Sequence, residues 1–388
     1  MRENFKPSNN LNQEKSIVMK NQKSIRSMLA LASAVIPSLA ATVFAGVADP
    51  VAVVSVVVPT NQTILSATPF ARPVEASGTI DSWSNVSTNA VLNLTLNAGE
   101  SIPSLANSFS DLNADTSYVL EVVDGDAIGL ILEAIGNTAS TVTVRGNIPN
   151  TLTIAAGSKF NLRKAWTLAS LFGSAADTNN VFGAGTTANS AAVKANVQLY
   201  DVDSGSLSTY YIATTGGRNW RKVGSTANFN HAPIGLGKGF VVINKQTNSN
   251  FAFTLSGDYR TARTRLICPP NKKLLIGNPG LFDVTLSDST IPVTSPTKTT
   301  GTPGNADTYG FWLNASKSFD NYKIGGTTTT NVQTNNGVVV PPGAAGYKVG
   351  GGSTRVNPTI AKYTSLLVTP YVTNAANVIT VAPSLIAQ

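Results

Sequence analysis

Short apolar segments recur at regular intervals between positions 77 and 165, and turn-forming residues separate them. The segments include AVLNLTL (90–96), SYVLEVV (117–123), STVTVRG (140–146) and FNLRKAW (160–166). Between them lie stretches with the Gly, Asn, Asp and Pro that turns favour: DGD (124–126), GNTAS (136–140) and NIPN (147–150). Short strands separated by turns at this regular spacing predict a small antiparallel barrel or sandwich, with a helix over 101–112 capping one end.

A second pattern begins near residue 193 and recurs towards the C-terminus. VQLYD (197–201) aligns with YGFWL (309–313), STYYI (208–212) with FDNYKI (319–324), and PIGLGKGFVVI (233–243) with VPPGAAGYKV (340–349). Features repeated in the same order predict a duplicated unit, although chance similarity between low-complexity β segments is the alternative.

These patterns together predict an all-β protein. The N-terminal β domain, a small antiparallel barrel or sandwich, is expected over 46–173, and a linker over 174–192. Two related β-sandwich-like repeat units are expected over 193–270 and 271–388, the second including the C-terminal strands.

The glycine-spaced stretch PIGLGKGFVVI raises the question of a phosphate-binding loop. Such a loop needs its glycines between a strand and a helix, so that the helix N-terminus faces the anion. Here Gly235, Gly237 and Gly239 lead into FVVIN, which favours a strand, and the second copy lacks Lys238 and this glycine spacing. We therefore interpret the stretch as a turn that enters the next strand.

The N-terminus has the three parts of a secretory signal. A basic region, a short apolar region and small residues before a cleavage site follow one another: Lys20, Lys23 and Arg26, then 28–39, then Val43-Phe44-Ala45. We expect a signal peptide over 1–45, with 1–18 as an upstream extension and cleavage after Ala45 or, alternatively, after Ala48. An uncleaved anchor is the other alternative.

The chain is therefore expected outside the inner membrane, extracellular or at the cell surface, and the choice among periplasm, surface and medium stays open. No later apolar run has the length of a membrane-spanning helix, so no membrane span is expected in the mature chain.

Charged residues make up only 12% of the 388 residues, about half the usual share. The net charge of +8 is spread thinly, which argues against a nucleic-acid partner. The chain has one histidine, His231, and one cysteine, Cys268, so a metal site built from several of these residues is excluded. His231 is expected in a loop, where a catalytic role for histidine is not favoured. We expect no enzyme activity and no cofactor. The local basic cluster is interpreted as a solvated strand end: Arg260, Arg263, Arg265, Lys272 and Lys273.

Residues 51–58 are nearly all valine, and β-branched side chains favour extended backbone. Because the strand is apolar on both faces, we expect both faces to be buried. The strand would then be either central in a sheet or donated to a neighbouring molecule. Its candidate assembly residues are Val51, Val53, Val54, Val56, Val57 and Val58. The C-terminal segments YTSLLVTPYV (363–372) and NVITVAPSLIA (377–387) are candidates for the same kind of strand addition.

Two further sites follow from residue types. Asp201 and Asp203 stand two residues apart, which suits a calcium ion, although the same pattern is typical of a hairpin turn. Aromatic residues of the repeat units are candidates for stacking on sugars, with core packing as the alternative: Tyr211, Trp220, Trp312 and Tyr322.

Several motifs, in order, resemble a family of exported all-β proteins of unknown function found mainly in Verrucomicrobia. They are a mature start at Asp49-Pro50-Val51, the segment TPFARP (68–73), the segment WTLASLF (166–172), and paired Pro/Gly blocks separated by LLIGNPGLFDVTL (274–286). The resemblance implies export and this architecture, and it implies no catalytic residues.

The sequence predicts a non-enzymatic extracellular or cell-surface structural protein. Its self-association as a homopolymer or surface assembly, such as a filament or layer built by strand addition, is the leading hypothesis. The alternative is a carbohydrate-binding or adhesive module that uses the repeat aromatics to hold a polysaccharide.

Overall fold

The computed structural model describes residues 51–68, 70–105, 109, 112, 114–260 and 263–277, followed by the strand segments 284–285, 308–313, 318–324, 333–335, 338–340, 346–348, 359–360, 365–369 and 377–381. In this part of the chain nearly every element is a strand, so the all-β class is confirmed. The one helix among the described residues is α1 (Leu168–Phe172). The expected helix over 101–112 is wrong for 101–105, which are not helical, and otherwise falls largely outside the described residues.

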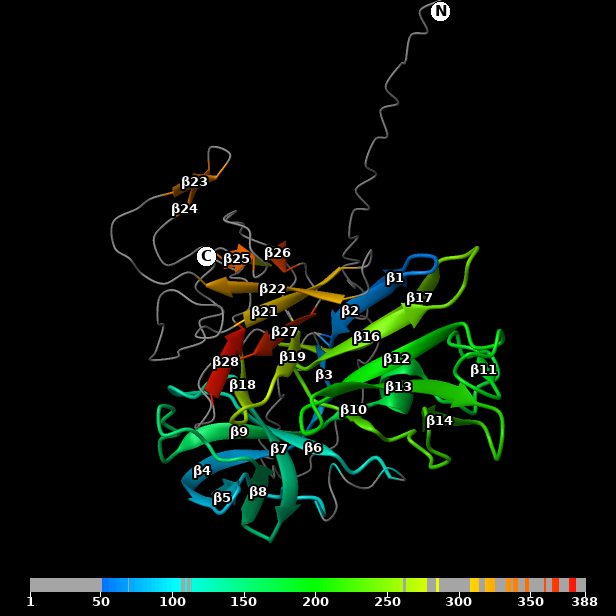
Figure 1. The fold of residues 1–388 in the computed structure, drawn as a ribbon. Helices are drawn as coiled ribbons and strands as arrows, with labels where there is room; N and C mark the ends of the chain where they lie inside the picture. The colour runs from blue at the N-terminus through cyan, green and yellow to red at the C-terminus, as the bar shows by residue number, and fades with distance from the viewer. Residues whose placement is uncertain are drawn as a thin grey trace, which may run out of the picture. The chain divides into compact units, whose positions relative to one another are not determined.

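Six antiparallel strands close into a barrel. They are β4 (Val74–Val86), β5 (Asn89–Leu96), β6 (Tyr118–Val122), β7 (Leu130–Asn137), β8 (Thr141–Arg145) and β9 (Ser158–Lys164). The ring runs β7-β6-β9-β4-β5-β8 and returns to β7 (Figure 1). Alternate side chains point inward and fill the interior, among them Leu92, Leu120 and Phe160. The predicted small antiparallel barrel is therefore confirmed.

The barrel sheet continues into later parts of the chain. β18 (Thr264–Cys268) pairs parallel to β7, and β28 (Asn377–Val381) pairs antiparallel to β18. One hydrogen-bonded sheet thus contains strands from the segments 46–173, 193–270 and 271–388.

Two further sheets share one aromatic core. The first contains β2 (Thr63–Ala67), β11 (Ala184–Gly185), β12 (Ala195–Asp201), β13 (Ser206–Ala213), β14 (Asn219–Lys222) and β16 (Gly239–Asn244). The second contains β1 (Val51–Val58), β17 (Phe251–Tyr259) and β3 (Phe70–Ala71). Between them the rings of Phe172, Phe182, Trp220 and Phe251 pack edge to face or tilted, with Phe182 and Phe251 centred 4.8 Å apart.

Helix α1 is set into this core. Thr167 accepts a hydrogen bond from the backbone N–H of Ser170, whose hydroxyl in turn accepts one from the backbone N–H of Thr167, a reciprocal capping box. Its residues Leu168, Leu171 and Phe172 are buried. Just before it, β10 (Trp166–Thr167) pairs with β15 (Pro233–Ile234), which tethers the start of the helix to the glycine loop.

A C-terminal sheet has the order β19-β27-β21-β22-β25. Its strands are β19 (Leu274–Gly277), β27 (Ser365–Thr369), β21 (Thr308–Leu313), β22 (Ser318–Ile324) and β25 (Gly346–Lys348). Two strand pairs lie beyond it, β20 (Val284–Thr285) with β26 (Thr359–Ile360) and β23 (Gln333–Asn335) with β24 (Val338–Val340).

The antiparallel hairpin predicted to repeat is present in both places, as β12–β13 and as β21–β22. The strand that follows the Pro/Gly turn differs between them. β16 pairs with β12, the first strand of its hairpin, whereas β25 pairs with β22, the second. In the C-terminal sheet, β27 and β19 occupy the places that β16 and β2 occupy in the first sheet.

The valine-rich strand β1 lies at a sheet edge, so the prediction of a central strand with cover on both faces is wrong. It pairs only with β17 among the described strands. Val58 is fully buried and Val54 and Val56 are half-buried against the aromatic core, but Val53 and Val57 are 66% and 54% exposed. Alternation of side chains along a strand sends these two outward.

Candidate functional site

The glycine loop joins two sheets at close range. The N–H of Gly277 on β19 donates to the carbonyl of Gly237 at 2.9 Å, and Gly237 has a φ of +78°. A Cβ on Gly239 would lie 2.4 Å from the Cβ of Ser365 on β27. The loop continues directly into β16, which confirms the predicted turn into a strand. Its glycines are needed because side chains would hold the two sheets apart.

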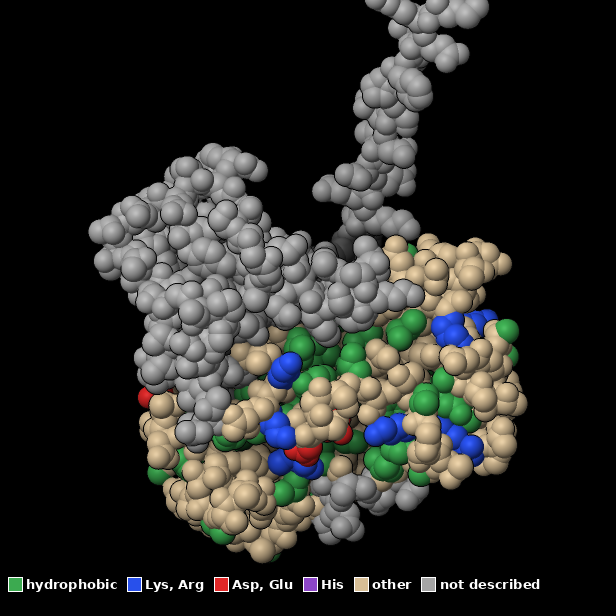
Figure 2. Space-filling model, viewed as in Figure 1, with side chains coloured by type: hydrophobic (Ala, Val, Ile, Leu, Met, Phe, Trp, Pro, Cys, Tyr) green, Lys and Arg blue, Asp and Glu red, His purple; other side chains and the backbone are tan. Residues whose placement is uncertain are grey.

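A pocket of about 720 Å³ lies beside this loop, between the barrel and the sheet of β12, β13 and β16. One wall comes from β7 and the end of β8, and the other from the β12–β13 hairpin and β14. Its lining mixes apolar, aromatic, acidic and basic side chains. Figure 2 shows acidic, basic and hydrophobic side chains gathered together on one face of the molecule.

An acidic side chain bound by two basic ones forms the barrel wall of the pocket. Glu133 on β7 pairs with Lys238 of the glycine loop through Oε1 and with the Nε of Arg145 through Oε2, the latter at 3.1 Å. Burial raises the pKa of Glu133, but attraction to Lys238 and Arg145 outweighs it, so the pKa lies below its usual value. Glu133 is therefore ionised at neutral pH and is a poor proton donor.

The calcium candidates lie on the opposite wall, in the turn of the β12–β13 hairpin. The Oδ1 of Asp201 accepts backbone hydrogen bonds from Asp203 at 2.9 Å and Ser204 at 3.3 Å, and its carbonyl accepts from Gly205. Burial raises the pKa of Asp201 and these hydrogen bonds lower it more, leaving it below its usual value. The backbone carbonyl of Asp203 already accepts from the Nζ of Lys272. Asp201 and Asp203 therefore form an Asx turn, and no group of three or more His, Cys, Asp or Glu suited to a metal occurs in the described part of the chain.

Two of the four candidate sugar-stacking residues are core residues. Trp220 is fully buried, and its Nε1 donates to the carbonyl of Gly173 at 3.1 Å. Tyr211 is also buried, beside Val193 and Ala213. Neither ring has a free face for a ligand, so their proposed role in binding is wrong and core packing explains both. The side chains of Trp312 and Tyr322 lie outside the described residues.

The basic cluster contains a buried ion network that the sequence interpretation missed. Arg260 is 8% exposed, and its Nε donates to Oε1 of Glu121 at 2.7 Å. Arg163 pairs with Glu121 at 3.3 Å and with Asp258 at 3.0 Å. The solvated reading is therefore wrong for Arg260, because its guanidinium neutralises a barrel carboxylate in the interior. Glu121 lies 139 residues before Arg260 in the chain, so no local pattern signals this pair.

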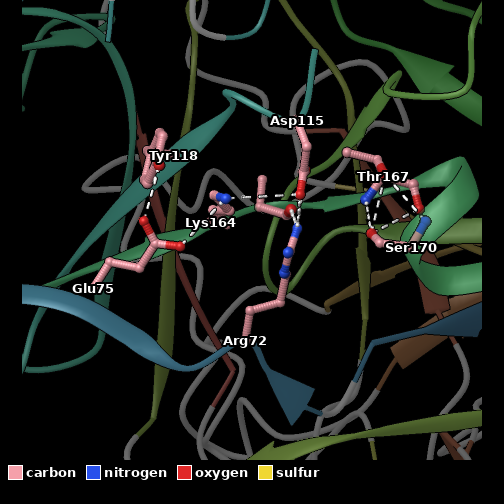
Figure 3. Close-up of polar contacts among 8 residues, drawn as sticks. Arg72, Glu75, Asp115, Tyr118, Lys164, Thr167 and Ser170 are labelled. Carbon is pink, nitrogen blue, oxygen red and sulfur yellow. Dashed lines mark hydrogen bonds and ion pairs between the residues drawn. The ribbon is translucent and has the colours of Figure 1, made fainter. Parts of the chain in front are cut away.

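A second polar network connects the motif TPFARP to the barrel strands β6 and β9. Figure 3 shows Arg72 directed at Asp115, Lys164 between Asp115 and Glu75, and Tyr118 beside Glu75. The contacts are 2.8 Å for Arg72–Asp115, 3.5 Å for Lys164–Glu75, and 2.9 Å for the hydrogen bond of Tyr118 to Glu75. Burial, and then the neighbouring Glu75, raise the pKa of Tyr118, so the phenol stays protonated. Every group in this chain of charges has a partner, which is typical of a structural network.

The two single residues noted in the sequence have different environments. Cys268 is buried, as expected for a small apolar side chain, and its Sγ contacts the carbonyl of Lys272 at 3.3 Å. His231 lies in the loop before β15, and its Nδ1 is buried without a hydrogen-bond partner.

The fold defines an all-β protein in which a closed six-stranded barrel shares its sheet with two strands from later in the chain, β18 and β28. Comparison of the chain with protein-family models, with characterised proteins and with solved structures finds no match. The resemblance to exported proteins of Verrucomicrobia thus stays a prediction. Among the described residues, no helix combines the length and apolar character needed to cross a bilayer.

Proposed function

We propose that this chain is an exported structural protein whose copies associate through the edge of strand β1. The observation that carries the proposal is that β1, an edge strand among the described strands, contains no residue that would oppose further pairing. β1 has eight residues, none charged and none proline, and its register with β17 is unbroken from Val51 to Val58. Proteins that avoid edge-to-edge pairing place lysine, proline or a bulge on such strands.

The outward face of this ribbon is equally free of charge. Val53 and Val57 stand opposite Ser256 and Ala252 on β17, and all four side chains are exposed. Ser55 stands opposite Thr254 in the same row. The backbone N–H and C=O groups of this edge can pair with another strand. Because the edge has no charged side chains, such pairing would not remove a charge from water.

A second copy of the chain is the partner that this strand fits. Six of its eight residues are valine, so an antiparallel pair of β1 strands brings valine opposite valine in almost any register. Antiparallel pairing of identical strands has two-fold symmetry, the commonest symmetry of protein assemblies. Of the two C-terminal candidates, β27 is less suited to donation because it already pairs on both sides, with β19 and β21, whereas β28 pairs only with β18 among the described strands.

The pocket carboxylates Glu133 and Asp201 are not suited to act as a general acid. Both have lowered pKa values, whereas a general acid needs a raised one. Export rests on the sequence signal in residues 1–45, which lie outside the described residues.

The test is a pair of double variants that add the same charge to the same face. Val53→Lys with Val57→Lys places two lysines on β1; Ala252→Lys with Ser256→Lys places them opposite, on the neighbouring strand β17, which pairs with β3 only at Asp258 and Tyr259. We expect sedimentation and electron microscopy to show assemblies for the unmodified chain and the β17 variant, and monomers for the β1 variant. Equal assembly by both variants, or a monomeric unmodified chain, would contradict edge pairing. Equal loss in both variants would instead indicate stacking of faces.

A further inference from the structure

The pocket beside the glycine loop is a cavity that the proposed assembly does not use. Its walls come from different sheets, the barrel on one side and the β12–β13 hairpin on the other. Both walls are held in place by the contacts described above, Glu133 with Lys238 on one side and the Asx turn of Asp201 on the other. A pre-formed cavity of about 720 Å³ is large enough for several sugar rings or a comparable small molecule.

Aromatic rings form part of the lining. The half-buried rings of Phe229, Tyr200 and Phe109 border the pocket, and the buried ring of Tyr210 packs edge to face behind Phe229, with centroids 5.6 Å apart. Burial raises the pKa of both Tyr200 and Tyr210, so their phenols stay protonated at neutral pH. The pocket therefore has apolar ring surface next to hydroxyl groups.

The charges of the lining balance. Three acidic residues, Glu133, Asp201 and Asp203, face three basic ones, Arg145, Lys222 and Lys238. Glu133 is already paired with two of the cations, and Asp201 with the N–H groups of its turn. The lining as a whole is therefore neutral and favours neither an anion nor a cation, and an acyl chain would bury these ions without hydrogen bonds, which is unfavourable.

We infer that this pocket binds a neutral carbohydrate. A sugar ring carries an apolar C–H face that stacks on aromatic rings. Its hydroxyls both donate and accept, so they use the spare lone pairs of carboxylates and the spare protons of lysines without breaking the existing pairs. This site does not include the four candidate stacking residues of the sequence analysis, and it is separate from the edge of β1.

The test is calorimetric titration of the purified chain with neutral hexasaccharides of glucose and of N-acetylglucosamine. Hexamannuronate and octanoate serve as the anionic and the apolar probes. We expect binding of at least one neutral hexasaccharide and neither of the other two. Phe229→Leu, which keeps apolar volume but removes the ring, should weaken binding about tenfold, the effect of one lost aromatic contact. Lys222→Met tests the polar wall and should weaken binding in the same direction.

Val181→Ala, at an exposed side chain outside the pocket lining, is the control and should bind like the unmodified chain. Thermal melting verifies that each variant is folded. The inference is overturned if no neutral hexasaccharide binds, if only hexamannuronate or octanoate binds, or if binding survives both pocket variants and is lost in Trp312→Ala. The β1 double-lysine variant should bind unchanged, which separates this inference from the assembly proposal.

Discussion

The indole Nε1 of Trp166 donates a hydrogen bond of 2.9 Å to the backbone carbonyl of Phe70, 96 residues earlier in the chain. The guanidinium of Arg72 lies over the same indole, 5.8 Å from its centre. The backbone carbonyl of Arg72 in turn accepts from Arg163 at 2.8 Å. The two motifs TPFARP and WTLASLF, recognised separately in the sequence, are thus two halves of one structural joint.

We expect Trp166→Phe to destabilise the fold, because the ring is retained while the carbonyl of Phe70 loses its donor. A half-buried acceptor left without a partner costs about 1–3 kcal/mol. Urea unfolding followed by circular dichroism measures the change. Val181→Ala, at an exposed position, should change the free energy of unfolding very little; a similar loss in both variants would argue against the joint.

Because the two sheets approach closely at Gly239, we expect Gly239→Ala to lower the free energy of unfolding. The new Cβ would lie 2.4 Å from Ser365, and crowding of a packed interior costs about 1–3 kcal/mol. Gly136→Ala on β7 is the matched control, because its Cβ would meet nothing closer than 4.0 Å and its backbone has ordinary angles. That variant should be neutral or slightly stabilising. Equal melting temperatures for the two variants would show that the sheets do not meet as described.

The pairing of Glu133 predicts a dependence of stability on pH. Its pKa is lowered in the folded chain, so its stabilising contribution is present above the unfolded pKa of about 4.3 and is lost as the pH falls through the folded value. Glu133→Gln should lack this component. Lys238→Met should raise the folded pKa and move the loss to higher pH. Unfolding curves between neutral and acid pH would test this, and identical profiles for all three proteins would contradict it.

Burial of Trp220 predicts a change in stability where the sequence suggested a change in binding. Trp220→Ala would leave a cavity in the aromatic core and destabilise the fold by about 3–5 kcal/mol. Trp220→Phe should lose less, because most of the ring volume remains. Chemical unfolding measures both, and a fully stable Trp220→Ala protein would place the indole outside the core.

Spacing and residue type alone were enough to predict the all-β class, the small barrel and the turn that leads into β16. These features depend on local pattern: alternation of side chains, β-branched content and turn residues act within a few positions of one another. The tertiary structure alone decided which strands meet. β1 and β18 pair with distant strands, Trp220 turns inward, and Glu133 meets Lys238 across 105 residues. Such pairings depend on which apolar surfaces are buried against each other in the folded chain. The local sequence pattern around a residue does not indicate which distant segment it will contact.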